Sequence, residues 1–226
     1  MINLLNIVNF KYVFIVLPNF FINPTDWQSI LTTVCFYFLM EVNPLNYFRN
    51  LIVIDSLWYL FDGLLTPMFS IYLSNFGSLE DIGISYAFIS MTQGFFSLFS
   101  DEAADFFGPV KTILIISVFL FFKTLCFVFV TNIYQIFFLQ IMGGILYAIQ
   151  LPAYDAVKAV LAGKKKVVEQ FSRYNSAVNF AIGIGALLSG VITLNFGFKA
   201  LFVLLAFSNL AYGLSITYLV RLDKKV

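Results

Sequence analysis

Long apolar runs recur along the chain, separated by short clusters of glycine, proline, asparagine and charged residues. A helix needs about 18 to 25 apolar residues to cross a hydrocarbon layer about 30 Å thick. The pattern therefore predicts an all-α membrane protein, a bundle of six transmembrane helices. The six expected spans are Phe48–Leu73, Gly83–Ala104, Thr112–Val130, Ile133–Ala156, Gln170–Leu194 and Phe198–Val220. No span alternates apolar and polar positions as the strands of a membrane barrel do.

Composition supports a place in the lipid bilayer and argues against several other classes of function. Apolar residues make up 61% of the 226 positions and charged residues only 11%, whereas about one quarter of a soluble domain is charged. A net charge of +1 provides no basic surface for nucleic acid. The chain has no histidine, and Cys35 and Cys126 lie alone in apolar runs. We therefore expect no metal site, no cofactor and no enzymatic activity.

The distribution of basic residues predicts which side of the membrane each end occupies. Basic residues crowd the link between the fourth and fifth spans and the tail after the sixth: Lys158, Lys164, Lys165, Lys166, Arg173, Arg221, Lys224 and Lys225. The connections on the other side hold Glu80, Asp81 and a single Lys199. Cytoplasmic loops carry the excess of lysine and arginine, so we expect the C-terminus in the cytoplasm. The protein itself is expected in a plasma or inner membrane.

The first 43 residues are poorly defined, and we separate them from the bundle expected over residues 44–226. Two apolar pieces, Leu4–Ile22 and Trp27–Val42, are interrupted by charge and proline, and neither makes a convincing span. Our hypothesis is that translation begins at Met40. Detection of peptides from residues 1–39 in the native protein would refute it. The alternative is an additional membrane helix or helical hairpin.

A loop between the second and third spans carries a family resemblance. Asp105–Lys111 (DFFGPVK) resembles the cytoplasmic loop signature of the major facilitator superfamily, a Gly-x-Leu-Ala-Asp-Arg-Phe-Gly type sequence that ends in basic residues. Asp105 and Gly108 match the signature. Phe106 takes the place of the arginine, and Lys111 alone keeps a basic charge. The resemblance implies a tight cytoplasmic turn at Gly108.

Further segments resemble the same family in the order in which its members carry them. They are Asp62-Gly63 followed by Pro67, Gly143-Gly144, Pro152–Ala156, the lysine-rich link, and Tyr174–Ala177. The resemblance covers about 180 residues and implies the N-terminal six-helix half of a secondary transporter. Such a protein moves a small solute by alternating access, with the substrate site between two bundles.

The chain contains enough spans for one bundle, so the resemblance implies a second. Two copies with the same topology could rebuild the transport path as a symmetric dimer. Alternatively, the C-terminal half is a separate polypeptide, or this reading frame is truncated or split, and we favour this explanation. The rival function is a non-transporting membrane scaffold or a decayed remnant of a transporter, which the altered loop signature favours.

Charged and polar residues inside the spans are the candidate binding groups, because charge at bilayer depth is costly. Asp62 and Lys123 lie about 20 Å from the cytoplasmic side at 1.5 Å per residue, so they could pair. Such a pair would contact a charged substrate or a coupling ion, a proton among them, or it would only neutralise two buried charges. Asp62 is the best single candidate. Gln93 and Gln150 could line the same path.

Two further acidic residues are assigned to the cytoplasmic end. Asp55 lies seven residues before Asp62, on much the same face of its helix, and we predict a gate hydrogen bond there. Asp155 is expected to close the fourth helix beside the Asp105 loop. By resemblance it shares a charge network with that loop, for which the available basic partners are Lys111, Lys158 and Arg173.

The remaining sequence features concern packing and subfamily. Ala181, Gly185 and Ser189 repeat at four-residue spacing, which favours close approach of another helix. Ala186 and Phe137 stand where proton-coupled drug exporters of the family carry a proline and an arginine, which argues against that type of exporter. Aromatic residues form 19% of the chain, and we interpret them chiefly as lipid contacts.

Overall fold

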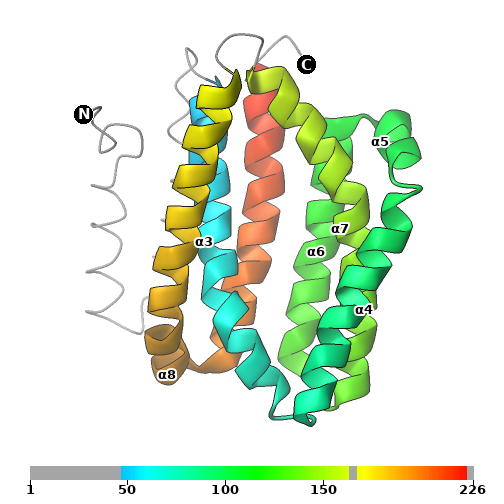
Figure 1. The fold of residues 1–226 in the computed structure, drawn as a ribbon, viewed down its shortest axis with the longest axis vertical. Coiled ribbons are helices and arrows are strands. Elements are labelled where there is room, and N and C mark those ends of the chain that lie inside the picture. Colours follow the sequence, from blue (N-terminus) through cyan, green and yellow to red (C-terminus); the bar gives the residue numbers. More distant parts are fainter. Residues whose placement is uncertain (1–46, 163–166, 223–226) are drawn as a thin grey trace.

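The computed structural model describes residues 47–162 and 167–222, and every regular element in this part of the chain is a helix (Figure 1). The elements are α3 (Tyr47–Leu73), α4 (Leu79–Ser97), α5 (Asp101–Phe107), α6 (Pro109–Cys126), the short 3₁₀ helix η2 (Phe127–Phe129), α7 (Ile133–Ala162) and α8 (Val167–Leu222). The N-terminal segment 1–43, with its hypothetical start at Met40, lies outside the described residues, as do Lys164, Lys165, Lys166, Lys224 and Lys225.

Helix α8 consists of two helical arms that meet at a sharp reversal. Gly197 has φ 75° and ψ 170°, a conformation that residues with a Cβ rarely adopt. We call residues 167–196 the first arm and residues 198–222 the second arm. Figure 1 shows the first arm, in yellow, descending beside α3 and the second arm, in red, returning to the end where the chain terminates. The predicted boundary between Leu194 and Phe198 is therefore confirmed.

The predicted second span, Gly83–Ala104, is wrong at both ends. Helix α4 begins earlier, at Leu79, because Ser78 and Asp81 form a capping box that satisfies the first backbone amides. It ends at Ser97, and Asp101–Phe107 forms a separate short helix. Near this break, Ser97 Oγ donates to the Gln93 carbonyl at 2.7 Å and Ser100 Oγ donates to the Ser97 carbonyl at 3.0 Å. Such local bonds compete with the helical ladder.

The fourth span runs longer than the predicted Ile133–Ala156, because α7 continues to Ala162. Pro152 lies inside the helix and does not end it. The final turns bury Val157, Leu161 and Ala162 in an apolar cluster, and this burial stabilises the additional helical turns. Asp155 therefore lies within a helix, and the prediction that it closes one is wrong.

Four helical segments are long and apolar enough to cross a membrane: α3, α6 continued through η2 to Phe129, α7 and α8. Helix α4 is not among them in the described part of the chain, since its 19 residues include Glu80, Asp81 and several hydroxyl and amide side chains. The surface of the bundle carries large apolar side chains, such as Phe119 at 54% and Phe122 at 59% exposure, as lipid contact requires. The number of crossings stays a prediction.

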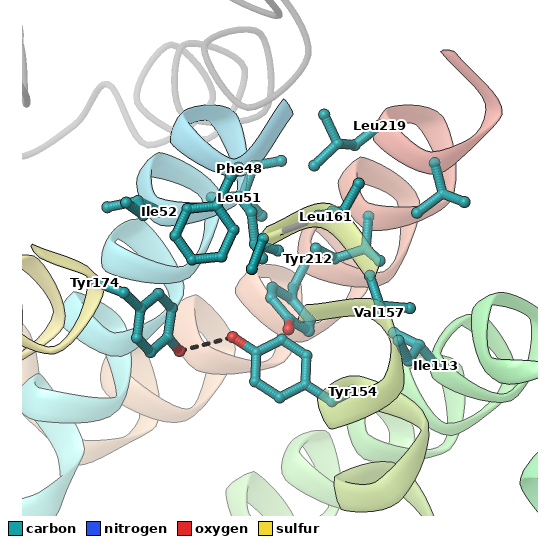
Figure 2. Close-up of a cluster of buried hydrophobic side chains, with 14 of the residues drawn as sticks. Phe48, Leu51, Ile52, Ile113, Tyr154, Val157, Leu161, Tyr174, Tyr212 and Leu219 are labelled. Atoms are coloured by element: carbon teal, nitrogen blue, oxygen red, sulfur yellow. Dashed lines mark hydrogen bonds between the residues drawn. The ribbon is translucent and has the colours of Figure 1, made fainter. Parts of the chain in front are cut away.

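Apolar clusters close the bundle at both ends. At one end, the start of α3, the end of α7 and both ends of α8 share a cluster that includes Leu51, Val157 and Leu219 (Figure 2). At the other end, Tyr72 and Leu73 of α3 pack with η2, α7 and Phe202 of α8. The polar residues considered below lie between these clusters or at the edge of the first.

Glycine allows two pairs of helices to touch backbone to backbone. A Cβ added at Gly63 would lie 2.5 Å from the Ile182 carbonyl oxygen, and one at Gly185 would lie 2.2 Å from the Leu60 carbonyl oxygen. Helix α3 and the first arm therefore interlock, as the small residues of the fifth span predict. Helices α4 and α7 meet in the same way, because a Cβ at Gly144 would lie 2.7 Å from the Ile89 carbonyl oxygen.

This contact predicts that Gly185→Leu prevents normal assembly of the bundle. The larger side chain would have to displace the backbone of α3, which places the substitution among those that cost about 4 kcal/mol or more. Gly183→Leu is the matched control, because nothing lies within 4 Å of a Cβ at Gly183. We expect detergent-solubilised Gly185→Leu to aggregate, or to lose its folded size-exclusion peak after heating to a temperature well below that needed for the control. Equal stability of the two variants would contradict the interlocking contact.

Candidate functional site

Two opposite charges lie inside the bundle, one on α3 and one on α6. Asp62 of α3 and Lys123 of α6, which the sequence places at a similar depth, interact electrostatically. They do not form a direct ion pair: within the described residues, no carboxylate oxygen lies within the 4.0 Å pairing distance of the Lys123 ammonium. Lys123 is only 9% exposed, so its charge is held inside the protein. The pair suggested by the sequence is thus a separated one.

Aromatic rings and a glycine determine the position of Lys123. Its Nζ lies 5.1 Å from the centre of the Phe127 ring and 5.7 Å from the centre of the Tyr147 ring, within the range of cation–π attraction. A Cβ added at Gly143 would lie 3.0 Å from the same Nζ. The ammonium group therefore occupies space that the missing side chain of Gly143 leaves on α7.

The surroundings of Asp62 are more open than those of Lys123. Tyr59, Asp62 and Thr66 follow one another at helical spacing on α3, and none of the three is fully buried. Thr66 Oγ1 donates to the Asp62 carbonyl oxygen at 2.9 Å. Tyr59 and Tyr147 both interact electrostatically with Asp62. Of these two tyrosines, Tyr147 also lies beside Lys123.

The two glutamines predicted to bind substrate lie on neighbouring helices. Gln93 is half-buried on α4, and Gln150 is buried on α7. No side-chain hydrogen bond of either residue is seen among residues 47–162 and 167–222, and neither is linked to Asp62 or Lys123 there. Their proposed role in binding stays a prediction.

A second buried acid is tied to tyrosines at one end of the bundle. Asp55 is completely buried, and the Tyr154 hydroxyl donates a hydrogen bond to its Oδ2. The hydroxyl groups of Tyr154 and Tyr174 lie 2.7 Å apart, as the dashed line in Figure 2 marks. Asp55 Oδ1 has no hydrogen-bond partner in the described part of the protein. The predicted hydrogen bond of Asp55 exists and joins α3 to α7 and α8, while its role as a gate stays a prediction.

Lys158 connects this acid cluster to the surface of α7. Its Nζ lies 4.3 Å from the centre of the Tyr154 ring and 2.7 Å from Asp155 Oδ1. Lys158 also interacts electrostatically with Asp55. Of the three basic partners considered for Asp155, the structure pairs it with Lys158, whereas Arg173 pairs with Glu169.

The loop signature forms the predicted turn. Gly108 has φ 80° and caps α6, and Pro109 occupies the first position of that helix, where its missing amide costs nothing. Asp105, at the end of α5, and Lys111, in the first turn of α6, both have exposed side chains. The tight turn expected from the resemblance is confirmed, and the charge network of Asp105 and Lys111 stays a prediction.

Sequence reasoning missed the tyrosine hydroxyls inside the bundle. Tyr154, Tyr174 and Tyr212 are buried and lie close together (Figure 2). All three interact with Asp55, so the interpretation of aromatic residues as lipid contacts is wrong for them. A phenol inside a membrane span needs a hydrogen-bond partner. Applied to Tyr154 and Tyr174, that requirement could have predicted polar contacts inside the bundle.

The Asp55 cluster predicts a large effect of a single missing hydroxyl. Tyr154→Phe removes the donor to a fully buried carboxyl, a change that costs about 1–3 kcal/mol. Asp55→Asn combined with Tyr154→Phe should cost less than the sum of the two single changes, because the donor and its acceptor form one network. Thermal unfolding of the four proteins in detergent measures this coupling. Strict additivity would show that the hydroxyl and the carboxyl do not interact.

Comparisons with known proteins agree with this architecture. The family model described as Major Facilitator Superfamily matches residues 52–226. An uncharacterised MFS-type transporter of Methanocaldococcus jannaschii is 24% identical over 146 residues, which cover 64% of this chain and 38% of that protein. No solved structure matches the chain. This chain therefore spans well under half the length of the curated relative that it matches.

Members of this family are transporters and not enzymes, and the apolar helices suit an integral membrane protein. The family match extends from the second turn of α3 through the second arm of α8, and it includes Asp62, Lys123 and the Gly108 turn. The chain belongs to the major facilitator superfamily of membrane transporters.

Proposed function

We propose that residues 44–226 form one half of a secondary transporter, which moves a small solute by alternating access against a second bundle. In this proposal α3, α4, α6, α7 and the two arms of α8 each cross the membrane. Helix α4 crosses although it is less apolar than the others, because one side packs closely on α7 at Gly144 and its acidic residues lie in the first turn, at the membrane surface.

The charge at the two ends of the bundle supports a cytoplasmic C-terminus. The start of α3, the end of α7 and both ends of α8 meet in one apolar cluster, and Tyr47 Oη donates to the Leu222 carbonyl at 2.9 Å. Arg49, Lys158, Arg173 and Arg221 belong to these segments. The opposite end carries Glu80, Asp81 and Lys199. The positive-inside rule then orients the first end toward the cytoplasm.

The observation that carries the proposal is the separated pair of charges. A charge at bilayer depth is costly unless another group offsets it, and a direct ion pair would be the simplest structural solution. Asp62 and Lys123 instead interact without pairing, and Asp62 keeps an incompletely buried side chain. This arrangement suits a site that a solute or a coupling ion completes.

The proposal predicts that Asp62→Asn slows uptake of the solute that the wild-type protein carries. Membrane vesicles from cells that express the chain with its partner should take up at least one member of a panel of labelled amino acids, carboxylates, amines and sugars. Loss of a charged contact should lower the initial rate about 10- to 100-fold. Glu80→Gln is the matched control, since Glu80 is exposed in the first turn of α4. Wild-type uptake by Asp62→Asn would refute the assignment of Asp62.

The need for a second bundle is supported by two helix faces without an internal partner. Only Ser85 of α4 is buried, and Met91 is 74% exposed. A Cβ added at Gly83 of α4, or at Gly190 on the first arm of α8, would meet nothing within 4 Å. Small residues let membrane helices approach closely. We assign these faces to the contact with the second bundle, which is either a copy of this chain or a separate C-terminal half.

This assignment predicts a crosslink through α4 and the first arm of α8. In a background without Cys35 and Cys126, the double variant Gly83→Cys/Gly190→Cys should form an intermolecular adduct in native membranes. A homodimer carries the introduced thiols on both chains, so oxidation should give a disulfide-linked adduct of twice the chain mass. For a separate half, a reagent that joins the introduced thiol to an amine of the partner should give an adduct of another mass, which mass spectrometry identifies.

The matched control is Phe119→Cys/Phe122→Cys on α6, whose side chains are 54% and 59% exposed. In this proposal these positions contact lipid and should not crosslink efficiently. Monomers alone for the Gly83 and Gly190 variant, or equal crosslinking in the control, would contradict the proposed contact.

A further inference from the structure

The two charges of the candidate site are held apart by independent parts of the fold. Asp62 precedes Gly63, whose backbone contact with Ile182 fixes the rotation of α3 against α8. Lys123 is positioned from another direction, by the Phe127 and Tyr147 rings and by the space at Gly143. Neither residue needs the other in order to keep its place. The separation between carboxylate and ammonium is therefore a property of the packed helices.

Lys123 keeps donors that the described protein does not use. An ammonium group has three N–H donors, and among the described residues no hydrogen bond or ion pair to this group is found. Its contacts there are the two ring faces, which offset positive charge but accept no conventional hydrogen bond. A buried ammonium in this state is completed by an anionic group such as a carboxylate.

Asp62, at a similar depth in the bundle, is a candidate binding group for a positively charged part of the solute. Its carboxylate lies on the more open side, beside Tyr59 and the exposed Thr66. A solute with one charge would satisfy one residue and leave the other unmatched. A solute with both charges would satisfy both and would add no net charge to the membrane interior.

We propose that the solute of this transporter is a small zwitterion, whose carboxylate binds Lys123 and whose ammonium binds Asp62. The inference rests on the proposed function and names the substrate class of that same site. In this proposal the partly exposed rings of Tyr59 and Tyr147 provide the apolar surface for the carbon skeleton.

Uptake of matched solutes tests the proposal. L-alanine, β-alanine and 4-aminobutyrate carry both charges, propylamine carries only the positive charge and propionate only the negative one. Uptake into vesicles that contain the chain and its partner should be at least about tenfold faster for one of the zwitterions than for propylamine or propionate, as expected for the loss of one charged contact. The thermal shift of the purified complex with each compound gives an independent measure of binding.

Reciprocal variants separate a binding role from a structural one. Lys123→Gln should shift the preference from zwitterions toward propylamine, and Asp62→Asn should shift it toward propionate. A pair that only neutralises buried charge would change stability without opposite changes in selectivity. Lys123→Arg, which keeps the charge, serves if Lys123→Gln does not fold, and it should keep the zwitterion preference. The matched controls are Glu80→Gln and Lys199→Gln, since both side chains are exposed.

The outcomes distinguish this inference from the proposed function. Uptake of a sugar, or of a solute with a single charge, with no zwitterion preferred, would overturn the inference and leave the transporter intact. Uptake of a zwitterion with unchanged selectivity in both single variants would also overturn it. Absence of uptake of every solute by the complete complex would refute the proposed function together with the inference.

Discussion

The structure depends on the backbone contact between α3 and the first arm of α8. In lipid, helices gain little from excluding water, so close packing and hydrogen bonds hold them together. Here Gly63 meets Ile182 and Gly185 meets Leu60 at distances that exclude any side chain. Because Asp62 is the neighbour of Gly63, the contact that holds the bundle together also determines where its central carboxylate lies.

Polar groups in the bundle form two sets that are satisfied differently. At the end closed by the start of α3 and the end of α7, Asp55 receives the Tyr154 hydroxyl and is linked through Tyr174 to the first arm of α8. Nearer the middle, Asp62 and Lys123 interact without direct contact. The first set joins helices through a closed network. The second set contains no direct ion pair among the described residues, and in the proposed function a solute completes it.

The sequence predicted the architecture where apolar runs and backbone requirements coincide. The limits of α3 and the reversal at Gly197 follow from the length of the runs and from the glycine itself, and the turn at Gly108 follows from the loop signature. Prediction failed for α4, where a capping box and local serine hydrogen bonds set the limits, and for the end of α7, where burial of Leu161 extends the helix. The pattern of apolar residues along the sequence reveals neither the local hydrogen bonds nor which residues become buried by packing.

The candidate site was predictable in part for a similar reason. Rise per residue places Asp62 and Lys123 at one depth, but it does not determine their side-chain contacts. The position of the Lys123 ammonium depends on the space at Gly143 and on the Phe127 and Tyr147 rings, which come together only through packing of α6 on α7. The tyrosine network around Asp55 was missed because its members lie on three helices that are distant in sequence.

The central claim is that Asp62 faces the path of the solute, and cysteine accessibility in native membranes tests it most directly. In a background without Cys35 and Cys126, Asp62→Cys should react with a small, charged, water-soluble thiol reagent. The reaction should be at least about tenfold faster than that of Leu64→Cys, whose native side chain is 3% exposed in the packing between α3 and α8. Equal reactivity at the two positions, or modification of Asp62→Cys only by a lipid-soluble reagent, would contradict the account.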